Sequence, residues 1–346
     1  MPTRIAINAR FMWRRITGVE RYAHEITTRL GDRIRLLAPT RPLGGIAGHI
    51  WEQTILPGML REGDLLWSPA NSGPLLIPDQ VLSIHDLAVI EHPEWFNPKF
   101  ARWYRFLIPR IIKGASLLIT PSNYTKIRIQ DTFWISPDKI KVVPPGVNLD
   151  LFRAPPIQEQ AKTRNIYGID VPYCLVVGSL EPRKNLDRLF QAWKLSRAAK
   201  NGYHLIVVGA GGRMFRNPDY DPLPENVLLA GMLGDQELVS LYAGARAFIL
   251  PSLYEGFGLT VLEAMACGAP VVASNTGAIP ETAGEAAIYF NPLETEDIAQ
   301  AIDQVTGDSE LINLLRKKGF ERVKDYTWSR TANQIWNLLQ GVLDES

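Results

Sequence analysis

Residues 247–274 read AFILPSLYEGFGLTVLEAMACGAPVVAS, and this stretch decides the fold. It opens with an apolar run at 247–252, passes through a turn that contains Gly256 and Gly258, and continues with a helical pattern at 259–267. A second apolar run follows at 270–274. Such near-continuous apolar strands are typical of parallel strands covered on both faces. The order strand, helix, strand therefore predicts a right-handed βαβ unit of a doubly wound sheet.

The same alternation extends in both directions along the chain. In the first half, strands are predicted at 4–9, 34–39, 64–69, 81–86, 116–121 and 140–145, and helices at 18–31, 50–62 and 98–113. In the second half, strands are predicted at 173–179, 204–210, 226–231, 247–252, 270–274 and 286–290, and helices at 185–200, 235–244, 259–267, 294–306, 308–325 and 327–343. Thr327 is the expected N-cap of the last helix.

A stretch rich in Pro, Gly and scattered charge, 144–172, reads as a linker between the two series. We therefore expect an α/β protein with two Rossmann-like doubly wound domains, 1–158 and 159–326, facing across a cleft. The segment 327–346 is expected to pack back on the first domain. In open α/β sheets, ligands bind beyond the carboxyl ends of the strands.

Composition restricts the class of protein. The chain has 346 residues, 46% of them hydrophobic, and a net charge of +1, which suits a globular protein with large cores. Residues 1–160 carry 20 Lys and Arg against 14 Asp and Glu, so the rest of the chain is acidic. No apolar stretch is long enough for a membrane span, and no secretory signal is read at the N-terminus. Cys174 and Cys267 are expected to be buried thiols in a reducing cytoplasm.

Glu255 and Glu263 flank the turn between the strand at 247–252 and its helix. Glycines permit close backbone approach, and the free N–H groups of a helix N-terminus favour an anion such as a diphosphate. Glu263 is placed to accept ribose hydroxyls. The simpler interpretation is a helix N-terminus with favourable acidic charge. A glycosidase carboxylate pair also remains open, because the sequence does not give their separation.

Two further segments place polar side chains at strand ends. In VGSLEPRKN (177–185), Arg183 and Lys184 come between a strand and a helix, where a diphosphate would lie. In SIHDLAV (83–89), His85 ends a strand and could donate a hydrogen bond to a sugar or carry a proton. A charged helix start and a turn-capping histidine are the simpler interpretations. His92 is read as loop structure.

With these motifs the chain resembles the retaining glycosyltransferases of the GT-B fold, family 4. Glu255 and Glu263 match that family's E-x7-E motif, and the resemblance extends from the loop at Gly18 to the last helix. The family reads G-R-x-x-x-x-K where this chain has 178–184, so Lys184 matches but Ser179 replaces the Arg. Arg183 is the candidate substitute. Segments like EPRKN occur in relatives that resemble GDP-mannose-dependent mannosyltransferases.

The resemblance implies transfer of a sugar with retention of anomeric configuration, without a metal and without a cofactor other than the nucleotide-sugar donor. Glu255 would hold the donor sugar and Glu263 the ribose, while Leu233 would meet the base through its main chain. The catalytic residues implied are His85, Arg183, Lys184 and Glu255. The donor-binding residues implied are Gly18, Gly178, Ser179, Leu233, Phe257, Gly258, Leu259 and Glu263.

The segment 99–115, KFARWYRFLIPRIIKGA, combines five basic residues with aromatic ones and contains no acid. At 100° per residue its cations fall within about 140° of a helical wheel. Such a face suits an anionic membrane surface, and FMWRR (11–15) could extend it. A core-packing helix with a solvated basic face is the equal alternative. Pro109 is expected to kink the helix.

The acceptor implied is a glycan or a polyprenyl-diphosphate-linked oligosaccharide, with the enzyme cytoplasmic or peripheral on the inner membrane face. UDP-glucose, UDP-N-acetylglucosamine and dTDP-rhamnose remain open as donors. A sugar-nucleotide epimerase, a phosphorylase and a non-catalytic nucleotide-sugar-binding protein are the rival functions. A nicotinamide site is disfavoured, because in VVGAGGRM (207–214) Met214 occupies the last glycine position of the dinucleotide fingerprint. Nucleic acid is not expected as a partner.

Overall fold

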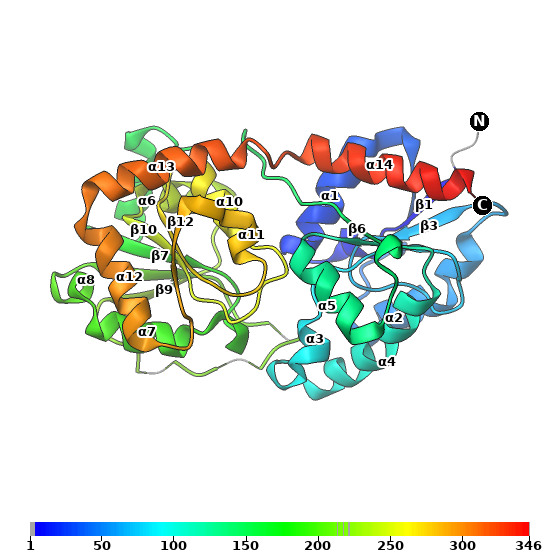
Figure 1. Cartoon of the computed structure of the whole chain (residues 1–346), viewed down its shortest axis with the longest axis horizontal. Helices are drawn as coiled ribbons and strands as arrows, with labels where there is room; N and C mark the ends of the chain where they lie inside the picture. The colour runs from blue at the N-terminus through cyan, green and yellow to red at the C-terminus, as the bar shows by residue number, and fades with distance from the viewer. Residues whose placement is uncertain (1–3, 213, 217, 221, 346) are drawn as a thin grey trace. The chain divides into compact units, whose positions relative to one another are not determined.

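The computed structural model describes residues 4–212, 214–216, 218–220 and 222–345 (Figure 1). The chain divides into two compact units. Unit 1 comprises Met1–Glu91, Pro98–Gly146 and Thr327–Ser346, and unit 2 comprises His92–Asn97 and Val147–Tyr326. The long stretch of unit 2 begins after Gly146, inside the expected linker and before the expected boundary at 158. The sequence pattern also gave no sign that 92–97 would group with the second unit.

Unit 1 is built on a six-stranded parallel sheet. Its strands are β1 (Ile5–Asn8), β2 (Arg35–Leu37), β3 (Leu65–Ser68), β4 (Val81–Ser83), β5 (Leu117–Thr120) and β6 (Ile140–Val142). Their spatial order is β2-β1-β3-β4-β5-β6, so the direction of winding reverses between β1 and β3. Each strand lies inside a range predicted from its apolar run.

Unit 2 carries a second six-stranded parallel sheet. Its strands are β7 (Tyr173–Val177), β8 (His204–Val208), β9 (Val227–Gly231), β10 (Ala247–Leu250), β11 (Val271–Ser274) and β12 (Ala287–Phe290). The spatial order β12-β11-β10-β7-β8-β9 is that of a Rossmann sheet, with its topological switch point between β7 and β10. The expected α/β class with two doubly wound parallel sheets is confirmed.

Both faces of the second sheet are covered. Leu175 and Val177 of β7 pack into one apolar cluster, whereas Cys174 and Val176 pack into the other. Successive side chains of a strand point to opposite faces, so a strand that is buried on both sides must be apolar throughout. The same burial raises the pKa of the Cys174 thiol to about 12, and both cysteines are buried and free.

The four predicted helices of unit 1 are present, one of them shifted, and the structure adds two that were not predicted, at 88–91 and 123–133. They are α1 (Gly18–Leu30), α2 (Gly45–Thr54), α3 (Ala88–Glu91), α4 (Pro98–Gly114), α5 (Asn123–Phe133) and α14 (Trp328–Asp344). The helix expected at 50–62 instead begins at Gly45 and ends before Pro57, because a proline cannot continue the hydrogen-bond ladder. Helix α4 continues through Pro109 to Gly114.

The helices of unit 2 differ from the prediction in three places, because two helices, at 157–166 and 279–283, were not predicted and one predicted helix is broken. They are α6 (Ile157–Ile166), α7 (Leu186–Leu195), α8 (Arg197–Lys200), α9 (Asp235–Gly244), α10 (Leu259–Ala266), α11 (Ile279–Ala283), α12 (Thr295–Gly307) and α13 (Ser309–Val323). The expected linker thus contains α6, which follows Pro156. The helix expected at 185–200 is broken at Ser196, whose hydroxyl accepts a hydrogen bond from the Ala199 amide and caps a new helix.

The last helix, α14, packs beside α1 in unit 1 (Figure 1). Thr327 caps it, as expected, by accepting a hydrogen bond from the Arg330 amide. The Trp328 ring is buried and meets the ring of Tyr22 edge to face at 6.2 Å. The Thr331 hydroxyl donates to the Pro144 carbonyl at 2.7 Å. A buried aromatic pair and this hydrogen bond therefore attach the C-terminal segment to unit 1.

We expect Trp328→Ala to lower the free energy of unfolding by about 3–5 kcal/mol, because it leaves a cavity beside Tyr22. Trp134→Ala is the matched control, since the Trp134 side chain is 92% exposed whereas that of Trp328 is 2% exposed. The control is expected to change the unfolding free energy by less than about 0.5 kcal/mol. Urea denaturation followed by circular dichroism measures both, and equal losses would contradict the packing role.

Candidate active site

The switch point of the second sheet gathers the predicted residues. Strands β7 and β10 pair in parallel, with Cys174 opposite Ala247 and Leu175 opposite Phe248. The segments that follow them, 178–185 and 251–258, therefore leave the sheet at the same edge. A backbone hydrogen bond of 2.9 Å from the Leu253 amide to the Arg183 carbonyl ties the two segments together. Parallel pairing thus joins two motifs that lie about 70 residues apart in the chain.

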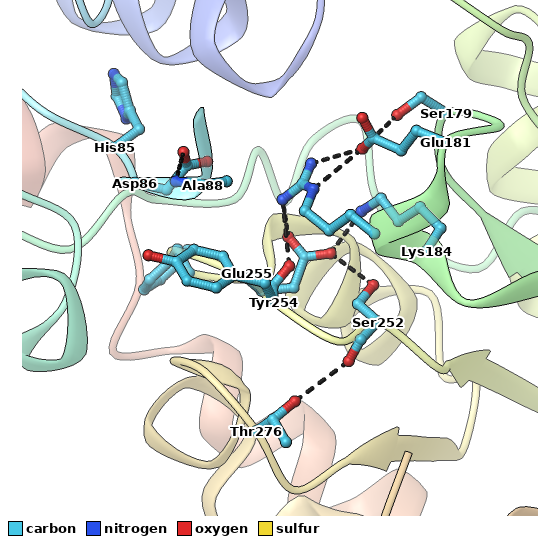
Figure 2. Close-up of polar contacts among 12 residues, drawn as sticks. His85, Asp86, Ala88, Ser179, Glu181, Lys184, Ser252, Tyr254, Glu255 and Thr276 are labelled. Atoms are coloured by element: carbon cyan, nitrogen blue, oxygen red, sulfur yellow. Dashed lines mark hydrogen bonds and ion pairs between the residues drawn. The ribbon is translucent and has the colours of Figure 1, made fainter. Parts of the chain in front are cut away.

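Glu255 is held by three side chains from these segments (Figure 2). Its Oε1 atom lies 2.5 Å from Lys184 Nζ and accepts a hydrogen bond from Ser252 Oγ at 2.7 Å. Its Oε2 atom accepts from Arg183 Nη1 at 3.1 Å. The two cations proposed for a diphosphate and the carboxylate proposed for a sugar therefore form one ion cluster.

The charge state of Glu255 follows from this cluster. Burial raises the pKa of a carboxyl, but Lys184 and Arg183 outweigh it and bring the pKa of Glu255 down to about 2. Glu255 is therefore ionised at neutral pH and has no proton to give to a leaving group. Glu255 therefore cannot be the general acid of a glycosidase carboxylate pair.

The five residues 181–185 explain how the cations are placed. Pro182 begins a 3₁₀ turn, Pro182–Lys184, that carries both cations. Asn185 ends this turn in the left-handed conformation, with φ of 55°. Its side-chain amide donates to the carbonyls of Pro251 at 3.2 Å and Pro292 at 2.8 Å. Asn185 thus anchors the turn to the segments that leave β10 and β12.

Gly178 and Gly209 make room for this turn. A Cβ atom at Gly178 would lie 3.1 Å from Lys184 Cε, so the glycine lets the lysine stem pack over the backbone. A Cβ atom at Gly209, where φ is 147°, would lie 1.8 Å from the Gly178 carbonyl oxygen. The first glycine of VVGAGG therefore serves close backbone packing against Gly178.

Residues at the end of β11 and just after it hold the segment 252–255, which carries Glu255. Ser274 Oγ donates to the Ser252 carbonyl at 2.7 Å, and Thr276 Oγ1 donates to the same oxygen at 3.2 Å. Gly277 has φ of 64°, and a Cβ atom there would lie 2.7 Å from the Glu255 carbonyl oxygen. Three successive strand ends, those of β7, β10 and β11, therefore build the surroundings of one carboxylate.

The remaining predicted donor residues of unit 2 lie on the following elements. Gly258 caps α10 with φ of 95°, and Leu259 is the first residue of the helix. Phe257 is buried, and its carbonyl accepts from Thr282 Oγ1 at 2.6 Å. Glu263 lies one turn into α10, where its Oε2 atom accepts from Tyr242 Oη at 3.4 Å. Leu233 follows β9 and is half-buried against the core.

Unit 1 contains the two other predicted site residues. Gly18 is the exposed first residue of α1. His85 follows β4, and its Nε2 atom lies 2.8 Å from the Pro69 carbonyl oxygen. Because a carbonyl only accepts, Nε2 carries the proton, and Nδ1 is the nitrogen left to accept. Burial lowers the pKa of His85, so the ring is neutral at pH 7. The expectation that it donates to a sugar is thereby revised.

His85 is held by residues that the sequence analysis did not single out. The Asn71 side chain accepts from the His85 amide at 2.6 Å, and Asn71 itself adopts a left-handed φ of 57°. The ring of Tyr22 meets the imidazole edge to face at 4.6 Å. In unit 2, Glu181, Asn185 and Ser252 were missed in the same way. Nothing in a single sequence marks an ordinary Ser, Asn or Glu as the partner of one particular side chain or carbonyl.

We expect Glu255→Gln to lower the free energy of unfolding by about 3 kcal/mol at pH 7, because the depressed pKa of Glu255 is worth about that much. The stabilisation is fully present above the ordinary pKa of 4.5 and disappears as the pH falls toward 2. The difference between wild type and variant should therefore shrink over that range, as measured by urea denaturation.

The matched control is Glu285→Gln, because the Glu285 side chain is 91% exposed. This variant should stay close to wild type at every pH. A pH-independent difference for Glu255→Gln would show that the carboxylate is not stabilised by its cations.

Comparisons with known proteins agree with this geometry. Residues 159–322 match the family model "Glycosyl transferases group 1", and residues 64–151 match "Glycosyltransferase Family 4". The chain is 29% identical to O-antigen chain mannosyltransferase B of Escherichia coli, over 74% of this chain and 69% of the relative. It is 28% identical to a GDP-mannose-dependent α-(1-6)-phosphatidylinositol monomannoside mannosyltransferase of Mycobacterium tuberculosis, over 68% of this chain and 65% of the relative.

Solved structures share the fold. A sucrose-phosphate synthase from Thermosynechococcus elongatus aligns with a TM-score of 0.76 at 20% identity, covering 99% of both chains. WaaG, a glycosyltransferase involved in lipopolysaccharide biosynthesis, aligns with a TM-score of 0.76 at 16% identity, covering 97% of this chain and all of its own. With two glycosyltransferase family regions on two parallel α/β sheets, the chain belongs to the family 4 glycosyltransferases of the GT-B fold.

Proposed function

We propose that the protein transfers mannose from GDP-mannose, with retention of anomeric configuration and without a metal, to a glycan or lipid-linked oligosaccharide of a surface polysaccharide. The names of the two mannosyltransferase relatives support the sugar, and one of them names GDP-mannose as its donor. The chain spans about two thirds of the length of those relatives. Among the described residues, no group of three or more His, Cys, Asp or Glu side chains is arranged to hold a metal.

The observation that carries the proposal is the cluster of Lys184, Arg183 and Glu255 at the switch point between β7 and β10. Ligands of open α/β sheets bind at this place. In the proposed complex, Lys184 and Arg183 contact the donor diphosphate, and Glu255 accepts hydroxyls of the sugar. Arg183 thereby provides the cation that relatives carry at the position of Ser179.

The chemical problem is the negative charge that develops on the leaving diphosphate. Two cations and the backbone N–H groups at the start of α10 stabilise that charge without rearranging during the reaction. No enzymic nucleophile is proposed. The acceptor attacks from the face that the diphosphate leaves, and the leaving phosphate takes the acceptor's proton. Glu263 is proposed to hold the ribose, the Leu233 main chain the base, and His85 a sugar hydroxyl through Nδ1.

The proposal is tested by thermal shift with GDP, GDP-mannose, UDP-glucose, UDP-N-acetylglucosamine, dTDP-rhamnose and NAD, each with and without EDTA. A ligand that binds only the folded state raises the melting temperature. We expect shifts from GDP and GDP-mannose alone, unchanged by EDTA. A shift from a UDP or dTDP compound instead would overturn the donor assignment, and loss of the shift with EDTA would overturn metal independence.

Product analysis then tests the reaction itself. NMR of the product formed from GDP-mannose and a polyprenyl-diphosphate-linked acceptor should show an α-mannosidic linkage, the configuration of the donor. A β-linkage would contradict retention. Conversion of the nucleotide-sugar without any acceptor would instead support the epimerase alternative.

We also propose that α4 of unit 1 meets an anionic membrane surface. All five of its cations are exposed: Lys99, Arg102, Arg105, Arg110 and Lys113. Its buried face, which includes Tyr104, Leu107 and Ile111, packs in the core. None of the helices in the described part of the chain has the length and apolar character of a membrane span. A basic face of this kind is suited to attachment at the surface of the bilayer.

Exposed apolar side chains lie beside this basic face. Phe106 of α4 is exposed, with the Arg110 guanidinium over its ring at 3.9 Å. Trp103 of α4 donates through Nε1 to His49 Nδ1 of α2 at 3.1 Å. This contact brings α2, whose Ile46 and Ile50 are exposed on neighbouring turns, next to α4. Apolar side chains surrounded by cations are typical of helices that lie in the membrane interface.

We expect the protein to co-sediment with vesicles containing phosphatidylglycerol, and the bound fraction to fall as salt is raised. The charge reversals Arg102→Glu and Arg105→Glu together should reduce binding at least about tenfold, at about 1 kcal/mol or more per cation. The control pair Lys194→Glu and Lys317→Glu changes the net charge equally, on exposed residues of unit 2. Equal loss in both pairs would show a general charge effect and contradict a specific surface on α4.

A further inference from the structure

Glu181 is a buried carboxylate beside the ion cluster that has no role in the proposed reaction. Its side chain is 0% exposed. Its Oε1 atom accepts three hydrogen bonds: from Ser179 Oγ at 2.9 Å, from Arg183 Nη2 at 2.8 Å and from Arg183 Nε at 3.1 Å (Figure 2). The other oxygen, Oε2, is buried and has no hydrogen-bond partner among the described residues. One oxygen of the carboxylate, Oε1, therefore makes both of the hydrogen bonds to Arg183.

This arrangement is unfavourable for Glu181 taken alone. A buried charge is costly unless it is paired, and an unpaired buried oxygen adds to that cost. Arg183 is the cation that pairs with this carboxylate. The local chain also fixes the geometry, because Glu181 precedes Pro182 and is held extended at φ of −138°. Backbone and charge together therefore aim the carboxylate at Arg183.

Arg183 is in turn held on its other side. Its Nη1 atom contacts Glu255 Oε2 at 3.1 Å and the Tyr254 carbonyl at 3.3 Å. The guanidinium is thus stretched between two carboxylates, with Nε and Nη2 on Glu181 and Nη1 on Glu255. Its side chain retains 15% exposure, so the site remains open to a ligand. Without Glu181, two of these contacts would be lost and the long side chain could rotate away.

We propose that Glu181 is a positioning residue that fixes the Arg183 guanidinium for contact with the diphosphate of the donor. The proposal rests on the function proposed above and deepens it. It predicts that Glu181 strengthens diphosphate binding through Arg183, although its own negative charge would repel a phosphate. The charge of Glu181 by itself would weaken diphosphate binding, whereas the positioning of Arg183 would strengthen it. A measurement of affinity therefore distinguishes the two effects.

The test compares the affinities for a nucleoside diphosphate and its monophosphate by isothermal titration calorimetry. The ratio of the two dissociation constants isolates the contribution of the terminal phosphate. The nucleotide used is whichever of GDP, UDP or dTDP binds the wild type. Binding of UDP or dTDP instead of GDP would overturn the proposed donor, but the role of Glu181 could still be tested with that nucleotide. If none of the three binds, both proposals are wrong.

Glu181→Ala and Arg183→Ala should each reduce the preference for the diphosphate about tenfold, the usual effect of losing a charge-assisted hydrogen bond. The double variant should lose no more of the preference for the diphosphate than Arg183→Ala alone, because both substitutions act through the same guanidinium group. Additive losses would overturn the proposal, and so would tighter diphosphate binding in Glu181→Ala.

Two further variants keep the result interpretable. Glu181→Gln preserves the volume of the side chain and one acceptor oxygen, so it should fold if Glu181→Ala does not, and it should lose part of the preference. Glu285→Ala removes a carboxylate of the same unit that is 91% exposed and pairs with Lys318, so it should stay near wild type. A Glu181→Gln protein with wild-type melting temperature and an unchanged preference would overturn the proposal.

Discussion

Parallel pairing of β7 with β10 is the constraint on which the site depends. The two strands follow one another in space but not in sequence, with β8 and β9 between them in the chain. Reversal of the winding at this pair leaves no crossover helix above the carboxyl ends, so the segments 178–185 and 251–258 meet there. Gly209 and Gly277 are needed because another backbone segment approaches each of them closely, whereas Gly178 makes room for the stem of Lys184.

The sheet of unit 1 reverses between β1 and β3, and polar residues gather there too. Asn8 ends β1, and its side chain donates to Glu52 at 2.7 Å, while Arg10 lies 3.3 Å from the same carboxylate. Both charged side chains are at most 3% exposed. In unit 2, by contrast, Arg183, Lys184 and Glu255 retain 10–15% exposure. The first switch point is thus filled by the protein's own charges, and the second keeps its charges accessible.

The strands and most helices could be predicted from the sequence because apolar runs and helical periodicity are local. The helix α6 was missed because its residues follow two prolines and have no clear apolar stripe. Arg183, Lys184 and Glu255 were predicted from their motifs, but their direct pairing was not, since it depends on strand order. Glu181 and Asn71 could not be predicted, because they act on other side chains or on the backbone of a distant loop.

The two cations of the site are fixed by different physical means, and this explains why the turn has the sequence EPRKN. The stem of Lys184 packs over Gly178, so steric contact limits where its ammonium group can lie. Arg183 has a longer side chain whose planar group needs directional partners, and it finds them in two carboxylates. This chain has Ser179 where the family pattern has an arginine, and Arg183 reaches Glu255 from the 3₁₀ turn Pro182–Lys184. In our proposal the buried Glu181, two residues earlier, fixes that arginine, whereas Gly178 makes room for the stem of Lys184.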